Sequence, residues 1–346
     1  MPQRDFFDKD IANTENTNGY YIIQENDFVY NPRKSNEAPY GPISIYKYKE
    51  KGIVSPLYLC FRATQKINPR YFEMYFKSSV WHKYIYFAGD SGARHDRVSI
   101  KDDVFFEMPI NLPSLSEQQK IADFLSLIDQ RIEKQRQLVE SLKKYKRGLF
   151  LKLYNDSEKK IYKICDLGKY CATGALSKDD IDVSGKYPCI LYGELFTKYG
   201  EVIKQVVSRT NVIPTYLSGT NEILFPSSTT ADAQSLIFPS SLKIKNISLG
   251  GDLFTIKLKN EFDSDFISYL VNFEYKNTLA RYAQGITIIH LYYTDIKEQV
   301  IDIPNVDTQF NISGVMRKIE TIIEMNINEL NSLLLMKKGF LQKMFI

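Results

Sequence analysis

Reactive and metal-binding side chains are scarce in this chain of 346 residues. It has four cysteines, three histidines and one tryptophan. The cysteines are Cys60, Cys165, Cys171 and Cys189, and no two of them form a Cys-x-x-Cys pair. Their spacing therefore assembles no zinc cluster, and reduced, buried thiols are expected. We expect no metal and no cofactor in this chain.

Long apolar runs and a diffuse excess of charge are also missing. No stretch approaches about 18 consecutive apolar residues, and the N-terminus MPQRDFFDKDIANTEN has no apolar signal core. We therefore expect a cytoplasmic protein with no membrane partner. Residues 1–112 carry 15 Lys and Arg against 14 Asp and Glu, and residues 155–303 carry 16 against 18. If the chain binds nucleic acid, local patches or partner subunits must supply the phosphate contacts.

Catalytic motifs are absent from the sequence as well. It contains no GxxxxGK[ST] loop, no glycine-rich methyl-donor fingerprint after a strand and no acid-x-Lys nuclease core. Asn31-Pro32 lacks the second proline and the aromatic residue of an NPPY methyltransferase motif. We therefore expect no catalytic residue in the chain.

A duplication is the most informative feature that is present. KRGLFLKLY at 146–154 returns 191 positions later as KKGFLQKMF at 337–345. The match runs backwards without a gap, placing Pro113 on Pro304, Gln118 on Gln309, Leu142 on Leu333 and Gly148 on Gly339. Because this period is far longer than that of solenoid repeats, each copy should be a whole domain plus a helix.

Each copy contains a long predicted helix with an apolar seam. Ser116, in a capping box with Gln119, is the expected N-cap of the first helix, and Asp307 that of the second. The two heptad series are Ile121, Ile128, Gln135, Leu142, Leu149 and Ile312, Ile319, Asn326, Leu333, Phe340. The expected alternate layers are Phe124, Leu138, Tyr145 and Val315, Ile322, Met336. A helix of about 38 residues, roughly 57 Å long, needs a partner for such a stripe, so we expect a coiled coil.

One polar residue interrupts each seam near its midpoint. If the helices pair antiparallel with aligned ends, Gln135 and Asn326 meet and can fix the register of the coiled coil. The alternative is that both are tolerated defects of the core. Preferential crosslinking of cysteines at 135 and 326 would support the first reading, and linkage of 135 to 312 would reject it.

The stretches before and between the helices share one order of elements. Residues 155–303 contain the strand-like runs YKICDLG, KYPCILYG, NEILFP and GGDLFTIKL, then a helical stretch over 264–282. Residues 1–112 offer NDFVYNP for NEILFP, SPLYLCFRA for DLFTIKL and RYFEMYFKSS for DFISYLVNF. They reach NDFVYNP about 35 residues sooner and lack a counterpart of IYKICDLG. We expect one fold used twice, with the first copy shortened at its N-terminal side.

The chain resembles the specificity subunit of a type I restriction-modification system over nearly its whole length. LPSLSEQQKIADFLSLIDQRIEKQRQLVESLKKYKRGLFLKLY carries the resemblance, with IYKICDLGKYCATG and ILYGEL. It implies an α+β fold: two target-recognition domains of mixed β-sheet and helices, joined by two long antiparallel coiled-coil helices. The implied segments are domain 1 at 1–112, spacer helix 1 at 113–154, domain 2 at 155–303 and spacer helix 2 at 304–346.

The resemblance also implies a function and partners. A subunit of this family is non-catalytic and binds double-stranded DNA, with each domain reading half of a bipartite target. It docks two modification subunits, which methylate adenine, and restriction subunits, which cleave DNA with ATP. Two rivals stay open: an interaction scaffold or half-site reader that needs a second copy because domain 1 is truncated, and a standalone nuclease, which the missing motifs disfavour.

The predicted DNA contacts of the first domain lie on two loops. Arg94, His95 and Arg97 belong to a glycine-rich loop that begins at Gly89, and Arg33 and Lys34 follow the NDFVY strand. Arginine can bridge guanine O6 and N7, or bind a phosphate. The alternative for the glycine-rich loop is a solvated turn in which Arg94 pairs with an aspartate.

The matching loops of the second domain have different chemistry. Hydroxyl groups from Ser227, Ser228, Thr229 and Thr230 stand where the first domain has Arg33 and Lys34. Arg281, Thr287 and His290 are the candidates near the second loop, and His290 is equally a structural residue. The basic run Lys143, Lys144, Lys146, Arg147 and Lys152 faces phosphates, a modification subunit or solvent.

Overall fold

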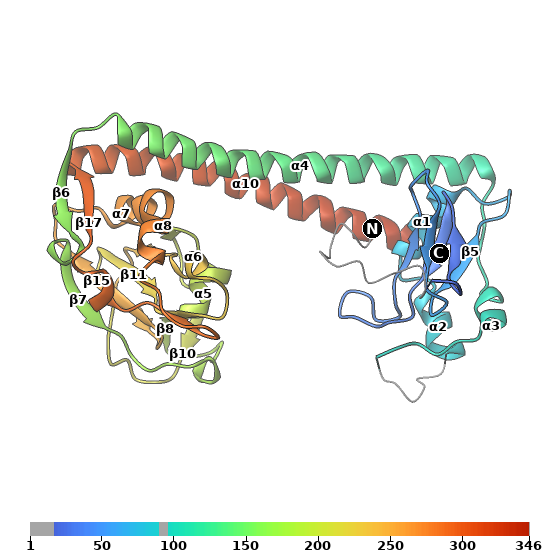
Figure 1. The fold of residues 1–346 in the computed structure, drawn as a ribbon, viewed down its shortest axis with the longest axis horizontal. Helices are drawn as coiled ribbons and strands as arrows, with labels where there is room; N and C mark the ends of the chain where they lie inside the picture. The colour runs from blue at the N-terminus through green and yellow to red at the C-terminus, as the bar shows by residue number, and fades with distance from the viewer. Residues whose placement is uncertain (1–16, 90–95, 346) are drawn as a thin grey trace. The chain divides into compact units, whose positions relative to one another are not determined.

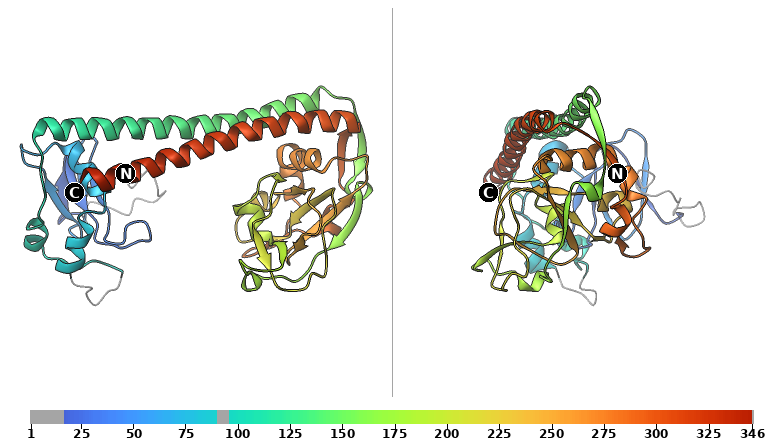
Figure 2. Two further views of the ribbon diagram at one scale, coloured as in Figure 1. Left: turned by 180° about the vertical axis from the view of Figure 1, so that it is seen from behind. Right: turned by 90° about the vertical axis from the view of Figure 1, so that its left-hand side faces the viewer.

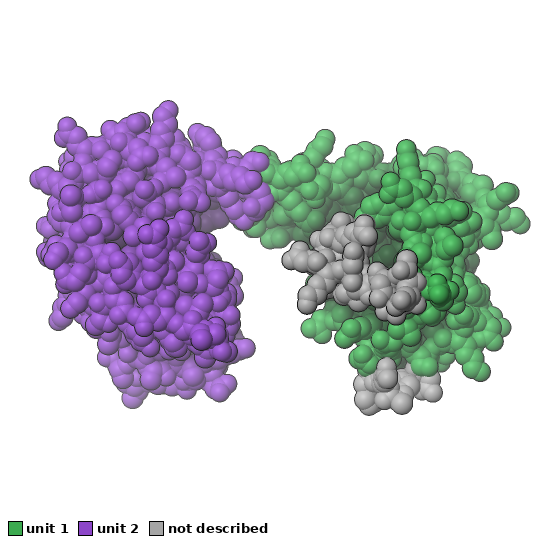
Figure 3. Space-filling model, in the orientation of Figure 1, with its two compact units in different colours: residues 1–138, 326–346 green, residues 139–325 purple. Residues whose placement is uncertain are grey.

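The chain folds into two compact units, coloured separately in Figure 3. The structure is a computed structural model that describes residues 17–89 and 96–345. Unit 1 consists of Met1–Leu138 and Asn326–Ile346, and unit 2 of Val139–Met325. Each unit contains one globular domain and a segment of both long helices (Figure 1). The α+β fold expected from the sequence is confirmed.

Unit 1 is built around a small antiparallel sheet. Its elements are β1 (Tyr21–Ile23), β2 (Asp27–Tyr30), β3 (Ile43–Ile45), β4 (Gly52–Val54), β5 (Leu59–Arg62), α1 (Pro69–Lys77), α2 (His82–Ala88), α3 (Asp102–Phe106) and the start of α4 (Leu115–Asn155). The described strands form one sheet in the order β3-β2-β5 and the pair β1-β4. Helix α1 packs against β3, and its Tyr71 and Tyr75 contact Phe345 after the end of α10. Figures 1 and 2 show the backbone of α1 and the end of α10.

Unit 2 has a larger version of the same sheet. Its strands are β6 (Lys159–Lys163), β7 (Gly168–Ala172), β8 (Tyr187–Ile190), β9 (Val202–Ile203), β10 (Ser208–Thr210), β11 (Glu222–Pro226), β12 (Ser228–Thr229), β13 (Ser240–Leu242), β14 (Ser248–Leu249), β15 (Leu253–Leu258), β16 (Ile289–His290) and β17 (Val300–Pro304). Its helices are η2 (Ile164–Asp166), η3 (Lys178–Asp180), α5 (Tyr192–Thr197), α6 (Ala233–Leu236), α7 (Ser264–Leu270), the π-helix η4 (Val271–Tyr275), α8 (Lys276–Ala280), α9 (Tyr293–Ile296) and α10 (Val306–Met344).

The strand register makes the two sheets equivalent. The main sheet of unit 2 runs β7-β15-β11-β13-β9. Phe225 pairs with Phe254 on β15, as Tyr30 pairs with Leu59 on β5. On the other side Leu224 pairs with Ser240, as Val29 pairs with Ser44. Strands β2, β3 and β5 therefore correspond to β11, β13 and β15, at an offset of 195 residues for β2 and β5.

The long helices begin two residues earlier than predicted. Ser114, not Ser116, caps α4: its backbone N–H and hydroxyl donate to Glu117, and the Glu117 amide donates back to the Ser114 hydroxyl at 3.3 Å. Asn305, not Asp307, caps α10, because its side chain accepts the Thr308 amide at 2.9 Å. Both predicted caps were therefore wrong. The true caps are equivalent residues of the duplication, each directly after the repeated proline.

The predicted seam was right in one layer and wrong in the other. Ile128, Gln135, Ile312 and Ile319 are buried, but Leu138 and Tyr145 are 45% and 59% exposed. Phe124 touches Phe340 only at the rim of the seam. The second buried layer lies one residue further on, at Leu125, Ile132, Val139, Met316 and Ile323. A period of 3.6 residues allows either spacing, and packing against the domains selects the second.

The two polar seam residues contact each other within unit 1. The Gln135 side-chain amide donates to the Asn326 side chain at 2.9 Å and to the Asn326 carbonyl at 3.0 Å. Arg131 pairs with Glu329, and Asp129 with Lys337, so the partner number rises as the α4 number falls. The helices are antiparallel, as expected. That the polar pair selects the register stays a prediction.

A repeated glutamine ties each long helix to its domain. Gln118 is 1% exposed; it accepts the Asn68 amide at 2.8 Å and donates to the Pro113 carbonyl at 2.9 Å. Gln309, equally buried, accepts the Asp263 amide at 2.8 Å and donates to the Pro304 carbonyl at 2.8 Å. Asn68 and Asp263 are the N-caps of α1 and α7. The repeated Pro-x-x-x-x-Gln motif thus joins two helix starts in each unit.

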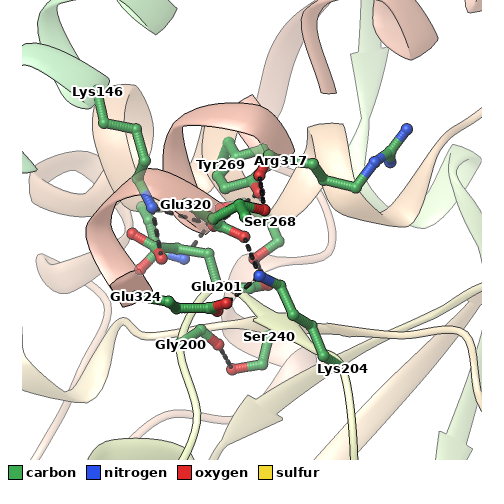
Figure 4. Close-up of polar contacts among 12 residues, drawn as sticks. Lys146, Gly200, Glu201, Lys204, Ser240, Ser268, Tyr269, Arg317, Glu320 and Glu324 are labelled. Atoms are coloured by element: carbon green, nitrogen blue, oxygen red, sulfur yellow. Dashed lines mark hydrogen bonds and ion pairs between the residues drawn. The ribbon is translucent and has the colours of Figure 1, made fainter. Parts of the chain in front are cut away.

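Unit 2 adds a buried polar network between the helices and the domain (Figure 4). The Lys146 ammonium lies 3.0 Å from Glu201 and 3.1 Å from Glu320, and Tyr269 of α7 donates to Glu320 at 2.7 Å. Burial raises the pKa of Glu320, and its contacts with Lys146 and Tyr269 offset only part of that effect. Lys146 is therefore a structural residue and not a free cation for phosphate. Lys204 completes the rim by pairing with Glu324.

Candidate nucleic-acid interface

In unit 1, two segments far apart in sequence meet beyond the end of β2. Arg33 forms an antiparallel β-bridge with Arg97. The Lys34 amide donates to the Asp96 carbonyl at 2.8 Å, and the Val98 amide donates to the Pro32 carbonyl at 2.8 Å. The tertiary fold therefore brings three of the predicted contact residues, Arg33, Lys34 and Arg97, onto one paired segment.

The turn that leads into this segment is tightly constrained. The Asn31 side chain accepts the Arg33 amide at 3.0 Å, and the Asn31 amide donates to the Pro42 carbonyl. Gly41 has a φ of 81°, and a Cβ there would lie 2.2 Å from the Asn31 carbonyl oxygen. Only glycine fits such a position without moving the turn. Gly41 therefore helps to fix the direction in which Arg33 leaves the sheet.

The cations of this segment are largely available. The Arg33 side chain is 69% exposed, and its nearest carboxylate, Asp96, is 4.0 Å away and 55% exposed. Such a pair contributes little and is easily exchanged for another anion. Within the part of the chain that the structure describes, the buried Arg97 Nε has no hydrogen-bond partner. Among the described residues, the segment presents positive charge that only the exposed pair of Arg33 with Asp96 offsets.

Unit 2 contains the same arrangement. Strand β12 pairs with β16, so Ser228 faces His290 and Thr229 faces Ile289. The Leu291 amide donates to the Ser227 carbonyl at 3.0 Å, as Val98 does to Pro32 in unit 1. His290 also exchanges two backbone hydrogen bonds with Gln284, closing the loop that contains Gly285 at φ 128°.

The equivalent segments differ in chemistry, not in backbone. We call residues 32–34 with 96–98, and residues 227–229 with 289–291, the paired segments of unit 1 and unit 2. The first displays Arg33, Lys34 and Arg97, and the second displays Ser227, Thr229 and His290, whose ring stacks on Tyr292. The same backbone arrangement therefore carries cations in unit 1 and mainly hydroxyl groups in unit 2.

The remaining predicted contact residues have different surroundings. Ser228 is only 5% exposed, so its hydroxyl supports the pairing from inside and we leave it out of the contact surface. Thr230 and Thr287 are exposed, and Arg281 is exposed directly after α8. Arg94 and His95 lie outside the described residues. Of the basic run on α4, Lys146 is buried and Arg147 donates to the Phe273 carbonyl.

Sequence reasoning identified both loops of each site but missed their pairing. No local pattern marks Arg33 and Arg97 as neighbours, because an isolated bridge has no periodicity. The backbone hydrogen bonds of Asp96 with Lys34 and of Gln284 with His290 were also not predicted. Alignment of the two copies at the offset of the strands, instead of that of the long helices, is the signal that could find them.

Between 17 and 89 and between 96 and 345, no group of three or more His, Cys, Asp or Glu side chains is placed to hold a metal ion. Among the helices of those segments, none is long and apolar enough to cross a bilayer.

Comparison with known families decides the class of this molecule. The model of the type I restriction modification DNA specificity domain matches residues 8–144 and again residues 156–334. The chain belongs to this specificity family. The double match covers both paired segments and most of both long helices, and it confirms the resemblance found in the sequence. No curated protein sequence matches the chain significantly.

Solved structures share the fold of this specificity-family chain at low identity. One comes from a study of complex assembly and conformational transition of the type I R-M system, with TM-score 0.62, 11% identity and coverage of 94% of this chain and 82% of that chain. The S subunit of a type I system from M. genitalium gives TM-score 0.51, 14% identity, and 94% and 84% coverage. Members of this family are generally non-catalytic specificity subunits.

Proposed function

We propose that this chain reads a bipartite DNA target as the specificity subunit of a type I restriction-modification complex. Each unit reads one half of the target through its paired segment and the neighbouring loop. The chain contributes recognition and assembly, and its modification subunits contribute the methyl transfer to adenine. Restriction subunits, which use ATP, join the same complex.

The equivalence of the two paired segments is the observation that carries this proposal. A duplicated backbone that displays different side chains is what a reader of two different half-sites requires. Arg33 and Arg97 can each bind guanine or a phosphate. Thr229 and His290 can donate hydrogen bonds to either DNA strand or accept them from it. The same backbone with the same side chains would instead suit a repeated half-site.

Partner subunits are needed for affinity. Neither globular stretch has more than one excess cation, so the non-specific attraction to phosphates must come largely from other chains. The exposed faces of α4 and α10 carry many charged residues and offer surface for two modification subunits, one for each copy of the duplication. We propose that docking uses these helices, with Lys143, Lys144 and Lys152 among the available cations.

Methylation mapping tests the proposal directly. The chain is combined with the modification subunits of its own system, and methylated adenines are mapped on genomic DNA. One sequence with two specified parts and a fixed spacer is expected. Arg33→Ala with Arg97→Ala should relax or abolish recognition of one part only, and Thr229→Ala with His290→Ala the other. Lys51→Ala, which removes an exposed cation of unit 1 outside the paired segment, serves as the control.

The second candidate function is a half-site reader that acts with a second copy. It is favoured by the smaller described sheet of unit 1, three strands against five in unit 2. In that case the methylated sequence would be a palindrome made of one half-site and its inverted copy. The unit 1 substitutions would then leave the sequence unchanged, while the unit 2 substitutions would remove all methylation.

A further inference from the structure

The loop before β16 in unit 2 displays an apolar side chain entirely to solvent. Ile286 is 100% exposed, and Ile288 is 49% exposed. Thr287 between them is exposed as well. Single apolar residues on a protein surface are common and have no meaning by themselves. What distinguishes Ile286 is that its loop is fixed and that the loop adjoins the candidate DNA contacts.

The backbone of this loop is fixed at its base and at its turn. Gln284 and His290 exchange two backbone hydrogen bonds, of 2.8 and 2.7 Å, which close the loop. Gly285 has a φ of 128°, and a Cβ there would overlap the carbonyl oxygen of Ile288. Only glycine adopts this turn without strain. Since Ile286 is fully exposed, the backbone and not side-chain packing determines where its side chain lies.

The three side chains at the tip of the loop are stiff. Ile286, Thr287 and Ile288 are all branched at Cβ, which restricts their χ1 rotamers. A side chain with few rotamers loses little conformational entropy when another molecule covers it. A contact at this tip therefore costs little in order, and it removes apolar surface from water.

The tip leads directly into the paired segment of unit 2. Ile289 pairs with Thr229, and His290 pairs with Ser228. An apolar group beside these residues would meet the base edges that Thr229 and His290 are proposed to read. In the major groove those edges present one apolar group, the C5-methyl of thymine.

The sequence of unit 1 has different residues at the matching positions. Arg97 corresponds to His290 through the equivalent backbone pairing, at an offset of 193 residues. At this offset Gly92 matches Gly285, but Ala93 stands for Ile286 and His95 for Ile288. The glycine is repeated in the sequence, and the large apolar residues belong to the second copy alone. Such a difference suits two domains that read different bases.

We propose that Ile286 packs against the C5-methyl group of a thymine in the half-site of unit 2, and so determines specificity for that base. The inference rests on the proposed function, because it requires DNA at the paired segment. Contact with this methyl group distinguishes thymine from cytosine, which carries only hydrogen at C5, and from both purines.

Replacement of thymine by uracil tests the inference, because uracil lacks only the methyl group. The probe is the target duplex found by methylation mapping, with deoxyuridine in place of one thymidine at a time. It is titrated with the chain bound to its modification subunits. The half-site of unit 2 is the one that Thr229→Ala with His290→Ala alters. At one position of this half-site, uracil should weaken binding about fourfold, as expected for one buried methyl group.

Substitutions of exposed residues assign the effect to Ile286. Ile286→Ser should bind the thymine and uracil duplexes equally, whereas Ile286→Val keeps a branched apolar side chain and should keep the preference for thymine. Ile161→Ser, at a residue of β6 that is 73% exposed, is the control and should keep the full preference. Uracil in the spacer between the half-sites should have no effect.

Failure of the inference and failure of the proposed function give different results. If the chain reads no DNA target, methylation mapping finds no sequence specified by the chain, and both are overturned. If only the inference is wrong, the mapped target is present and one of three results follows. The unit 2 half-site contains no thymine, uracil at every position of it binds as well as thymine, or Ile286→Ser keeps the wild-type preference.

Discussion

The same lysine–carboxylate pair has two environments in the two units. Lys146 with Glu320 in unit 2 and Lys337 with Asp129 in unit 1 are equivalent residues of the duplication. The side chains of the first pair are 8% and 11% exposed, and those of the second 19% and 33%. The Tyr269 hydroxyl donates a hydrogen bond to Glu320 of the first pair. The equivalent residue of α1 is Met74, whose side chain has no hydrogen-bond donor.

The difference in burial predicts that the two equivalent contacts contribute different amounts to stability. In unit 2 two carboxylates, a lysine and a tyrosine satisfy one another away from water, and loss of one leaves the others buried. In unit 1 solvent can replace either partner. The predictions below use the duplication as an internal control, because each change in one unit has its counterpart in the other.

Removal of the lysine should give the largest contrast. Lys146→Met removes the nearest cation of Glu320 and Glu201, leaving Glu320 with Lys204 at 3.8 Å, and should destabilise unit 2 by about 3–5 kcal/mol. Lys337→Met should destabilise unit 1 by about 1 kcal/mol or less, because its partner is accessible to water. Hydrogen exchange of each unit, followed by mass spectrometry, measures both. Equal losses of stability in the two units would mean that burial does not determine how much each lysine–carboxylate pair contributes.

Removal of the repeated glutamine should have a smaller and more equal effect. Gln118→Ala and Gln309→Ala each leave a backbone amide and a proline carbonyl without their partner, so a loss of about 1–3 kcal/mol is expected in the unit concerned. Thermal unfolding and local hydrogen exchange at α1 and α7 report the change. Gln137→Ala, at an exposed glutamine of α4, is the control and should change neither.

The contributions of two carboxyl groups to stability, Glu320 in unit 2 and Asp27 in unit 1, should change with pH in opposite directions. Because burial raises the pKa of Glu320, its contribution is greatest below the ordinary value of 4.5 and is lost as the pH rises through the raised pKa. The stability of the wild-type chain relative to Glu320→Gln should therefore fall as the pH rises. Unfolding by urea at several pH values measures this, and a flat difference would contradict it.

Asp27 of unit 1 provides the opposite case. Burial alone would raise the pKa of Asp27, but hydrogen bonds from Arg62 and from the Gln24 amide lower it overall. Its contribution is present above the ordinary value of 3.8 and is lost as the pH falls through the lowered pKa. Relative to Asp27→Asn, the wild-type chain should lose stability on acidification, in the same urea experiment.

The smallest expected effect concerns the polar pair of the seam. Gln135→Leu with Asn326→Leu removes both partners of a hydrogen bond together, so stability should change by less than about 1 kcal/mol. What should change is the register. Cysteines placed at 128 and 333 should crosslink less selectively in the double variant, and equal selectivity would show that the apolar layers alone fix the register.

Direct crosslinking of cysteines at 135 and 326 in the otherwise unchanged chain is expected.

Local patterns predicted the elements better than their details. The runs NDFVYNP, NEILFP and DLFTIKL are strands, and the stretch predicted helical over 264–282 is α7, η4 and α8. The helix caps were misplaced because Ser114 and Ser116 are equally suitable residues, and only the path of the chain after Pro113 selects between them. The second layer of the seam was misplaced because spacings of three and four residues both fit a helix.

The sequence by itself determined the duplication, the family, the antiparallel helices and the two loops of each candidate site. The duplication and the apolar seam follow from repeats and periodicity, which are properties of the chain in one dimension. The family and the antiparallel helices follow from the resemblance that the helix motifs carry. Tertiary structure alone decided that Arg33 pairs with Arg97 and Ser228 with His290, that Lys146 is buried, and that β15 lies between β11 and β7. Each of these depends on which backbone lies beside which across more than 50 residues, and hydrogen bonding over such distances leaves no periodic mark in the sequence.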